Sequence, residues 1–124
     1  MIWFLEGQSS QRDIIQGARD ALPPEVKIFA SHRDDRPEIT AGADISFTEP
    51  RGAEERISWV ISTAHTYGIK VILAGRLGGL FERARARFEK AGLVLVTGVT
   101  SIRNIDLVDY KSRITAITFS HFTL

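Results

Sequence analysis

Short continuous apolar runs alternate along the chain with segments whose apolar residues recur every three or four positions. We interpret the continuous runs as buried strands, and they span Ile2–Leu5, Val26–Ala30, Ala43–Phe47, Val71–Leu73 and Leu93–Val96. Continuous rather than alternating apolar strands are typical of a parallel sheet that is covered on both faces. The pattern predicts an α/β fold, a Rossmann-like open parallel sheet of about five strands in the order 3-2-1-4-5, with right-handed crossovers and helices on both faces.

The periodic segments predict the helices. The first starts at a cap on Ser9 or Ser10 and stops before Pro23-Pro24, because proline lacks the N–H that a helix interior needs. The later helices are expected over Ala53–Tyr67 with a cap at Gly68, over Leu80–Ala91 with an end at Gly92, from Ser101 to about Val108, and from Asp109 onward. The polar stretch Ser31–Pro37 is expected to be a loop.

Composition narrows the class of protein. With 124 residues, 44% of them hydrophobic and 25% charged, the chain fits one ordinary globular domain. A formal charge of +1 gives no general attraction to nucleic acid or to an anionic membrane, so neither is an expected partner. The basic run Arg83–Arg87 is interpreted as a solvated helix face. There is no cysteine, no secretory leader and no apolar run near 20 residues, so a cytoplasmic location is expected.

Ligands of an open parallel sheet bind beyond the carboxyl ends of its strands. The loop after the first strand contains one glycine, Gly7, and so lacks the three glycines of a dinucleotide fingerprint. It can still offer N–H groups to an anion, or be a tight turn with a serine cap. Asp34 and Asp35 follow the second strand, where a dinucleotide-binding protein keeps its ribose acid, but a solvated loop is the favoured interpretation.

Several kinds of active site are not predicted. A phospho-receiver domain would need clustered acids after the first strand, where Glu6 stands alone, and an Asp where the third strand ends in Thr48-Glu49. His32 is expected in a loop and His65 on a helix surface, and no histidine has a second ligand at helical spacing. The sequence therefore predicts no catalytic residue and no metal ligand in this chain.

The turn after the fourth strand carries more information. It contains Gly75, Arg76, Gly78 and Gly79. Glycines let the backbone approach a ligand closely, and arginine is a fixed cation with planar donors. The turn is therefore a candidate substrate-binding site, although the glycines can equally serve only to turn a strand into a helix.

Taken together, the segments from Gly75 to Gly98 resemble the N-terminal domain of the ATP-grasp ligases, namely biotin carboxylase and the large subunit of carbamoyl phosphate synthase. The resemblance rests on a glycine-rich turn, a helix that ends near a glycine, a hydrophobic strand, and a later acid–lysine step. That step is Val108-Asp109-Tyr110-Lys111, with one residue inserted between acid and lysine. The loop after the first strand departs from the Arg-Gly-Glu of biotin carboxylase, so that enzyme's substrate is not carried over.

The resemblance implies a domain that works with two further, ATP-grasp domains. Residues 1–108 would be the pre-ATP-grasp domain, and residues 109–124 would begin the linker or helix that leads into the two ATP-grasp domains. The full enzyme would use ATP and magnesium to activate a carboxylate as an acyl phosphate, which an amine then attacks. Lys111 would bind ATP phosphate, or else be an ordinary surface lysine. Gly7, Gly75, Arg76, Gly78 and Gly79 would border the carboxylate substrate. This fragment is expected to bind no cofactor and to be inactive.

Two alternatives stay open. The chain could be a stand-alone α/β module that binds a small anion or a protein, or, with the least support, a complete small enzyme. For a fragment we expect self-association, a possible homo-oligomer, through the apolar residues Ile114, Ile117, Phe119 and Phe122 of the last segment.

Overall fold

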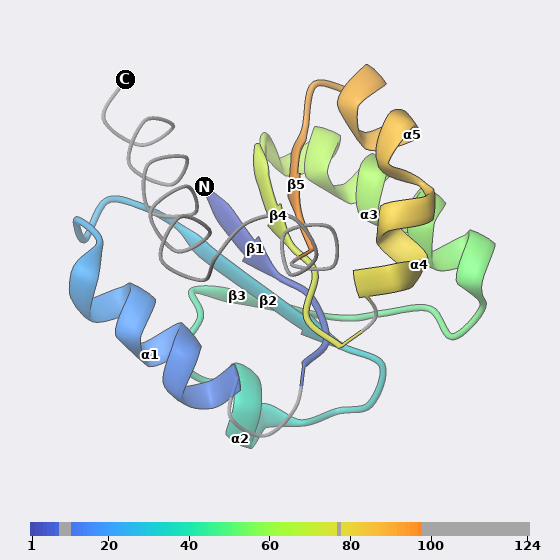
Figure 1. Ribbon diagram of the computed structural model, residues 1–124. Helices are drawn as coiled ribbons and strands as arrows, with labels where there is room; N and C mark the ends of the chain where they lie inside the picture. The colour runs from blue at the N-terminus through green and yellow to red at the C-terminus, as the bar shows by residue number, and fades with distance from the viewer. Residues whose placement is uncertain (8–10, 77, 98–124) are drawn as a thin grey trace, which may run out of the picture.

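The computed structural model describes residues 1–7, 11–76 and 78–97. They form a parallel five-stranded sheet in the order β3-β2-β1-β4-β5 (Figure 1). The strands are β1 (Ile2–Phe4), β2 (Ile28–His32), β3 (Ile45–Thr48), β4 (Val71–Leu73) and β5 (Val94–Val96). This confirms the α/β open sheet and the strand order that the sequence predicts.

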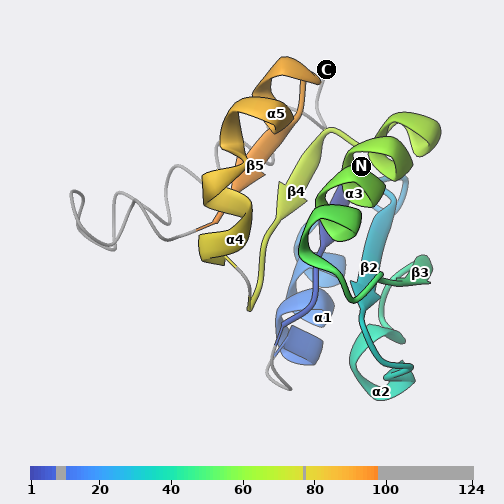
Figure 2. The same cartoon turned by 90° about the vertical axis from the view of Figure 1, so that its right-hand side faces the viewer.

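Helices cover both faces of the sheet, as Figures 1 and 2 show. On one face lie α1 (Gln11–Ala21) and the short α2 (Pro37–Thr40). On the other lie α3 (Ala53–Tyr67), α4 (Gly78–Arg83) and α5 (Arg85–Lys90). None of the described helices has the length and apolar character needed to cross a membrane.

Successive residues of each strand point to opposite faces, and so the sheet separates two cores. Beneath α3, α4 and α5 the core is rich in aromatic rings, including Trp3, Phe29, Phe81 and Phe88. Beneath α1 the core is mostly aliphatic, and its buried residues are Ile2, Phe4, Ile15, Leu22, Val26, Ile28, Ala30 and Val71. The register aligns Ile2 with both Ile28 and Val71, so β1 is the central strand of both cores.

Some boundaries differ from those predicted. The second strand begins and ends two residues later than expected, so Ser31 and His32 belong to β2 rather than to a loop, and both are buried. Pro37 opens α2 instead of closing a loop, because proline's fixed φ suits the first position of a helix. The third strand is shifted to Ile45–Thr48 and the fifth starts at Val94.

The predicted helix over residues 80–91 is in fact two short helices. The break falls at Ala84, whose φ of −102° and ψ of 11° are not helical. Ala84 is buried in the aromatic core beside Phe81 and Phe88. By contrast, α3 has the predicted bounds, and Gly68 ends it with a left-handed φ of 72°. The proposed caps at Ser9 and Ser10, and the helices expected after Gly98, lie outside the described residues.

Candidate functional site at the carboxyl edge of the sheet

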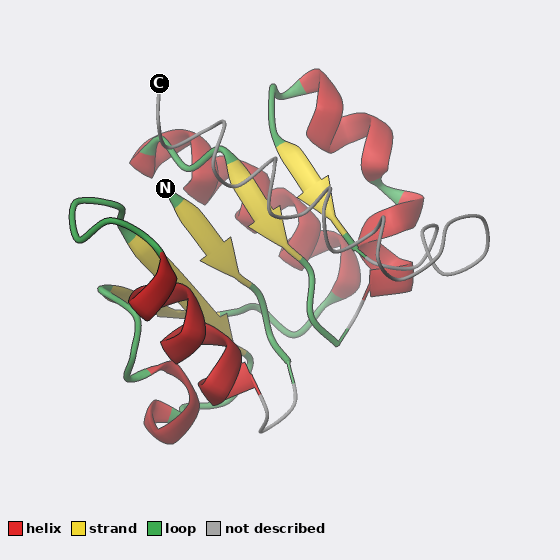
Figure 3. Cartoon of the chain, turned by 60° about the vertical axis from the view of Figure 1, so that its left-hand side comes forward, coloured by secondary structure: helices red, strands yellow, loops and turns green. Residues whose placement is uncertain are grey.

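All five strands run the same way, so the loops that follow them meet at one edge of the sheet (Figure 3). The chain leaves β1 toward α1 on one face and leaves β4 toward α4 on the other face. The switch point of an open α/β sheet, where ligands bind, therefore lies between β1 and β4. Glu6 and Gly7 border it on one side, and Gly75 and Arg76 border it on the other.

The turn after β4 packs against the backbone after β1. The N–H of Arg76 donates to the carbonyl oxygen of Glu6 at 2.7 Å. A Cβ on Gly75 would lie 2.5 Å from that same carbonyl oxygen, so no other residue fits without backbone movement. The Arg76 side chain is exposed. The turn thus holds Arg76 by its backbone and leaves its side chain exposed.

The other predicted glycines have different surroundings. Gly7 is buried, and a Cβ there would collide with the side chain of Gln11, which donates a short hydrogen bond to the carbonyl of Leu5. Gly78 and Gly79 lie inside α4 rather than in the turn. A Cβ on Gly79 would meet only the far end of Arg83, at 4.0 Å. Of Gly75 and Gly79, only Gly75 lies where close packing excludes a side chain.

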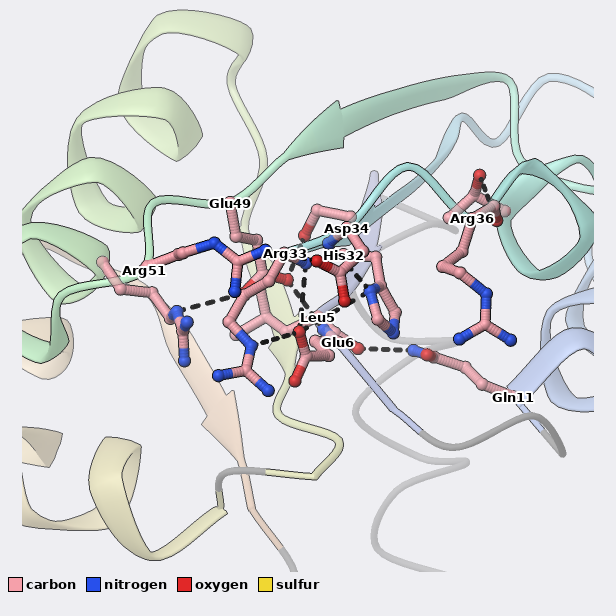
Figure 4. Close-up of polar contacts among 12 residues, drawn as sticks. Leu5, Glu6, Gln11, His32, Arg33, Asp34, Arg36, Glu49 and Arg51 are labelled. Atoms are coloured by element: carbon pink, nitrogen blue, oxygen red, sulfur yellow. Dashed lines mark hydrogen bonds and ion pairs between the residues drawn. The ribbon is translucent and has the colours of Figure 1, made fainter.

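A buried carboxylate follows β1 at the centre of the edge. Glu6 is 2% exposed, and its Oε1 accepts from the backbone N–H of Arg33 at 3.0 Å and from the Arg33 Nε–H at 2.8 Å. Figure 4 shows Arg33, His32 and Gln11 converging on the Leu5–Glu6 segment. The loop after β2 is therefore fastened to the loop after β1 by one carboxylate oxygen.

A second buried carboxylate follows β3. Glu49 accepts through Oε2 from the backbone N–H of Glu6 and from the hydroxyl of Ser31, both at 2.7 Å. Ser31 in turn accepts from the indole N–H of Trp3 at 2.8 Å. Glu49 Oε1 lies 3.4 Å from Nε of Arg56, a residue of α3 that is 2% exposed. These contacts join β1, β2, β3 and α3 in one network, which we call the Glu6–Glu49 network.

The two carboxyl groups differ in acidity. Burial acts to raise the pKa of Glu6, but the hydrogen bonds and charge of Arg33, with a smaller contribution from His32, outweigh it and lower that pKa. Burial raises the pKa of Glu49, and the nearby charge of Glu6 adds to this, against the hydrogen bonds from Ser31 and the Glu6 amide and the charge of Arg56. Glu6 therefore holds its charge more firmly than Glu49 does.

Three buried atoms of the network lack a hydrogen-bond partner among the described residues: Glu6 Oε2, Glu49 Oε1 and Arg56 Nη2. Within those residues, no three acidic or histidine side chains come together in a way that could hold a metal ion. Each carboxylate is almost fully buried and accepts hydrogen bonds through one oxygen, Glu6 Oε1 or Glu49 Oε2, so the network acts as a scaffold that positions neighbouring groups.

His32 is not a loop residue, as the sequence suggested, but the last residue of β2, and it is 4% exposed. Its Nδ1 accepts from the N–H of Asp34 at 3.2 Å and lies 3.6 Å from Glu6 Oε1. The His32 ring is thus fixed at the end of β2 beside the Glu6 carboxylate.

The two acids after β2 are solvated, whereas the basic run Arg83–Arg87 forms ion pairs. Asp34 and Asp35 are exposed, and Asp34 pairs with the exposed Arg51. In the basic run, Arg85 pairs with Glu82 through two hydrogen bonds of 2.9 Å, and Arg87 reaches Glu54 on α3. The basic run therefore forms ion pairs that join α5 to α4 and α3. Lys111, expected at the ATP phosphate, and the apolar residues of the last segment lie outside the described residues.

The sequence prediction missed the Glu6–Glu49 network. Glu6 and Glu49 are 43 residues apart, and neither belongs to a recognisable motif. One signal was available: Arg56 lies four residues before Val60 and eight before Ala64, on the buried stripe of α3. A charged residue in such a stripe needs a buried partner.

A comparison of the sequence with models of known protein families, and with curated proteins, finds no match in either.

Proposed function

We propose that this chain is the N-terminal domain of an ATP-dependent carboxylate–amine ligase, similar to carbamoyl phosphate synthase, that is not catalytic by itself. In such a reaction a carboxylate oxygen attacks the γ-phosphorus of ATP, and ADP leaves with the electron pair of the broken P–O bond. An amine then attacks the acyl carbon, phosphate leaves, and the amine loses a proton. ATP and magnesium would be held mainly by two ATP-grasp domains, with Lys111 reaching an ATP phosphate. The cysteine-free composition fits the reducing cytoplasm.

The observation that carries the proposal is the position of Arg76. It follows β4 at the switch point, its backbone is fixed on Glu6, and its side chain is exposed and has no partner among the described residues. A guanidinium so placed can hold a carboxylate through two parallel hydrogen bonds. Holding the substrate's carboxylate while other domains deliver ATP is a positioning role, and positioning carries much of phosphoryl transfer.

The test uses the enzyme expressed from the complete gene, assayed with magnesium-ATP, hydroxylamine and a panel of small carboxylic acids. Hydroxylamine attacks an acyl phosphate to give a hydroxamate, so the expected result is carboxylate-dependent release of ADP with hydroxamate formation. Lys111→Met should reduce ATP use roughly 10- to 100-fold, because one charge-assisted phosphate contact is lost.

The 124-residue chain by itself should neither hydrolyse ATP nor bind it tightly. A low-micromolar dissociation constant for magnesium-ATP in calorimetry contradicts the proposal. The alternative, a stand-alone anion-binding module, predicts that the complete protein holds a carboxylate at the same turn without consuming ATP.

A further inference from the structure

Two arginines flank Glu6 at the carboxyl edge. Arg33 follows β2 and Arg76 follows β4, and these are the two strands that pair with β1. With neighbouring strands about 4.8 Å apart, the two chains leave the sheet roughly 10 Å from each other, with Glu6 between them. Glu6 contacts both: its Oε1 holds the Arg33 side chain, and its carbonyl oxygen holds the Arg76 backbone.

Arg33 differs from the other arginines of this edge in how it is held. Its partner Glu6 is buried, and Arg33 binds it through both its backbone N–H and its Nε. Arg51 and Arg36 pair instead with Asp34 and Glu38, which are exposed carboxylates. An ion pair between exposed side chains fixes neither partner firmly. The Arg33 guanidinium is therefore preorganised, whereas those of Arg36 and Arg51 are not.

The free end of Arg33 is available for a ligand. The side chain is 31% exposed, and its two terminal nitrogen atoms have no partner among the described residues. In Figure 4 they point away from the Glu6 carboxylate. Because Nε is occupied, the two Nη groups remain as an end-on pair of donors, a geometry that matches the two oxygens of a carboxylate or phosphate.

From these contacts we infer that Arg33 is a second anion-binding residue of the edge, and that the substrate is a carboxylic acid with a second anionic group. Arg76 binds one anionic group and Arg33 binds the other, while Glu6 is a positioning residue for both. The inference rests on the proposed function for the role of Arg76 but adds a residue and a substrate class. The second group can be a carboxylate or a phosphate, since both present paired oxygens to a guanidinium.

The experiment is a titration of the ¹⁵N-labelled 124-residue chain, followed through the Nε–H resonance of Arg33 and the amide of Gly75. The probes are succinate, phosphonoacetate and butyrate at matched ionic strength. We expect at least one of the two dianions to bind about tenfold more tightly than butyrate, and the stronger of them identifies the second group. Arg33→Met should remove this preference, so that neither dianion binds more tightly than butyrate.

Arg36→Met is the matched control, since it makes the same substitution in the same loop and should leave the preference intact. Arg33→Lys keeps the charge, and therefore the fold, but cannot offer paired donors, so it should also lose the preference. In Glu6→Gln, addition of a dianion should shift and sharpen the Arg33 Nε–H resonance less than in wild type, and the preference for dianions over butyrate should weaken. A purely structural role for Glu6 would not change that preference.

Equal affinity for butyrate and both dianions overturns the inference, as does an unchanged preference in a folded Arg33→Lys variant. The proposed function fails separately: it falls if the complete protein forms no ADP or hydroxamate with any carboxylate, whatever the behaviour of Arg33. If Arg76→Ala loses butyrate binding while the Arg33 variants keep the wild-type preference for dianions, the turn at Arg76 binds a carboxylate but Arg33 is not a second anion site.

Discussion

The two sides of the carboxyl edge are fixed by different means. On the β2–β3 side, the loops are joined by buried side chains, with Glu6 and Glu49 accepting hydrogen bonds from Arg33, Ser31 and backbone amides. On the β4 side, the turn is fixed by a backbone hydrogen bond and by the absence of a side chain on Gly75. The first arrangement contains buried charge, whereas the second contains none.

The difference amounts to two ways of positioning an arginine at this edge. Arg33 is positioned through its own side chain, so its geometry depends on the charge and the hydrogen bonds of the Glu6–Glu49 network. Arg76 is positioned through its backbone, and its side chain is exposed. Perturbations of the network should therefore cost stability, while those at Arg76 should affect ligand binding.

The largest effect is expected for Glu49→Ala. The substitution leaves the Glu6 amide and the Ser31 hydroxyl without their acceptor and Arg56 buried without its counter-charge. Removing one partner of a buried pair costs about 3–5 kcal/mol. The free energy of unfolding, measured in urea by the fluorescence of the buried Trp3 and the partly buried Trp59, should fall by that amount. Glu25→Ala, at an exposed glutamate, should change it by less than about 0.5 kcal/mol. A loss below about 1 kcal/mol would show that the network does not hold this side together.

On the β4 side, Gly75→Ala should be destabilising by about 1–3 kcal/mol, because the new methyl group overlaps the backbone of Glu6. Gly17→Ala is the matched substitution in α1, where an added Cβ meets nothing within 4 Å. Alanine is the better helix former, so this variant should gain up to about 1 kcal/mol. Thermal unfolding of the two variants measures the contrast, and equal shifts would refute close packing at Gly75.

The two carboxylates should give pH dependences of opposite sign. The pKa of Glu6 is lowered on folding, so its contribution to stability is present above the unfolded pKa, about 4.3, and is lost as pH falls through the folded value. The pKa of Glu49 is raised, so the folded state binds the extra proton and stability falls as pH rises from that unfolded value through the folded one. Urea unfolding of Glu49→Gln and Glu6→Gln across this range tests the signs. Relative to wild type, Glu49→Gln should gain stability as pH rises, and Glu6→Gln should lose it.

The smallest effect on folding is expected for Arg76→Ala. Its side chain is exposed and has no hydrogen bond or ion pair to other described residues, so the free energy of unfolding should change by less than about 0.5 kcal/mol. A larger loss in urea unfolding would mean that Arg76 supports the turn and is not free for a ligand.

Much of the fold could be predicted from the sequence because its signals are local. The helix Ala53–Tyr67 has four turns of apolar periodicity and a glycine cap, and it was predicted residue for residue. The strand Val71–Leu73 was equally clear. By contrast, the break at Ala84 has no proline or glycine to mark it, and α2 is only four residues long. Short elements carry little periodic signal, and so tertiary packing decides them.

The candidate site, too, has one part that the sequence predicts and one that it does not. The position of Arg76 follows from a local pattern, a glycine next to an arginine after a strand. The Glu6–Glu49 network depends on which strands lie side by side, and neither acid is marked by its neighbours. Polarity predicts a loop for Ser31 and His32, yet Ser31 is buried because its hydroxyl is hydrogen-bonded on both sides. A polar residue is expected to be exposed only where the interior offers it no hydrogen-bond partner.

The most direct test of the central proposal, that the β4 side presents Arg76 to a carboxylate, is steady-state kinetics of Arg76→Ala in the proposed ligase, expressed from the complete gene. The Michaelis constant for the carboxylate should rise roughly 10- to 100-fold, as expected for one lost charge-assisted contact, while kcat and the Michaelis constant for ATP stay near wild type. Arg87→Ala, which removes an exposed arginine from α5, should leave all three unchanged. A Michaelis constant for the carboxylate that is the same in Arg76→Ala as in wild type would contradict the account.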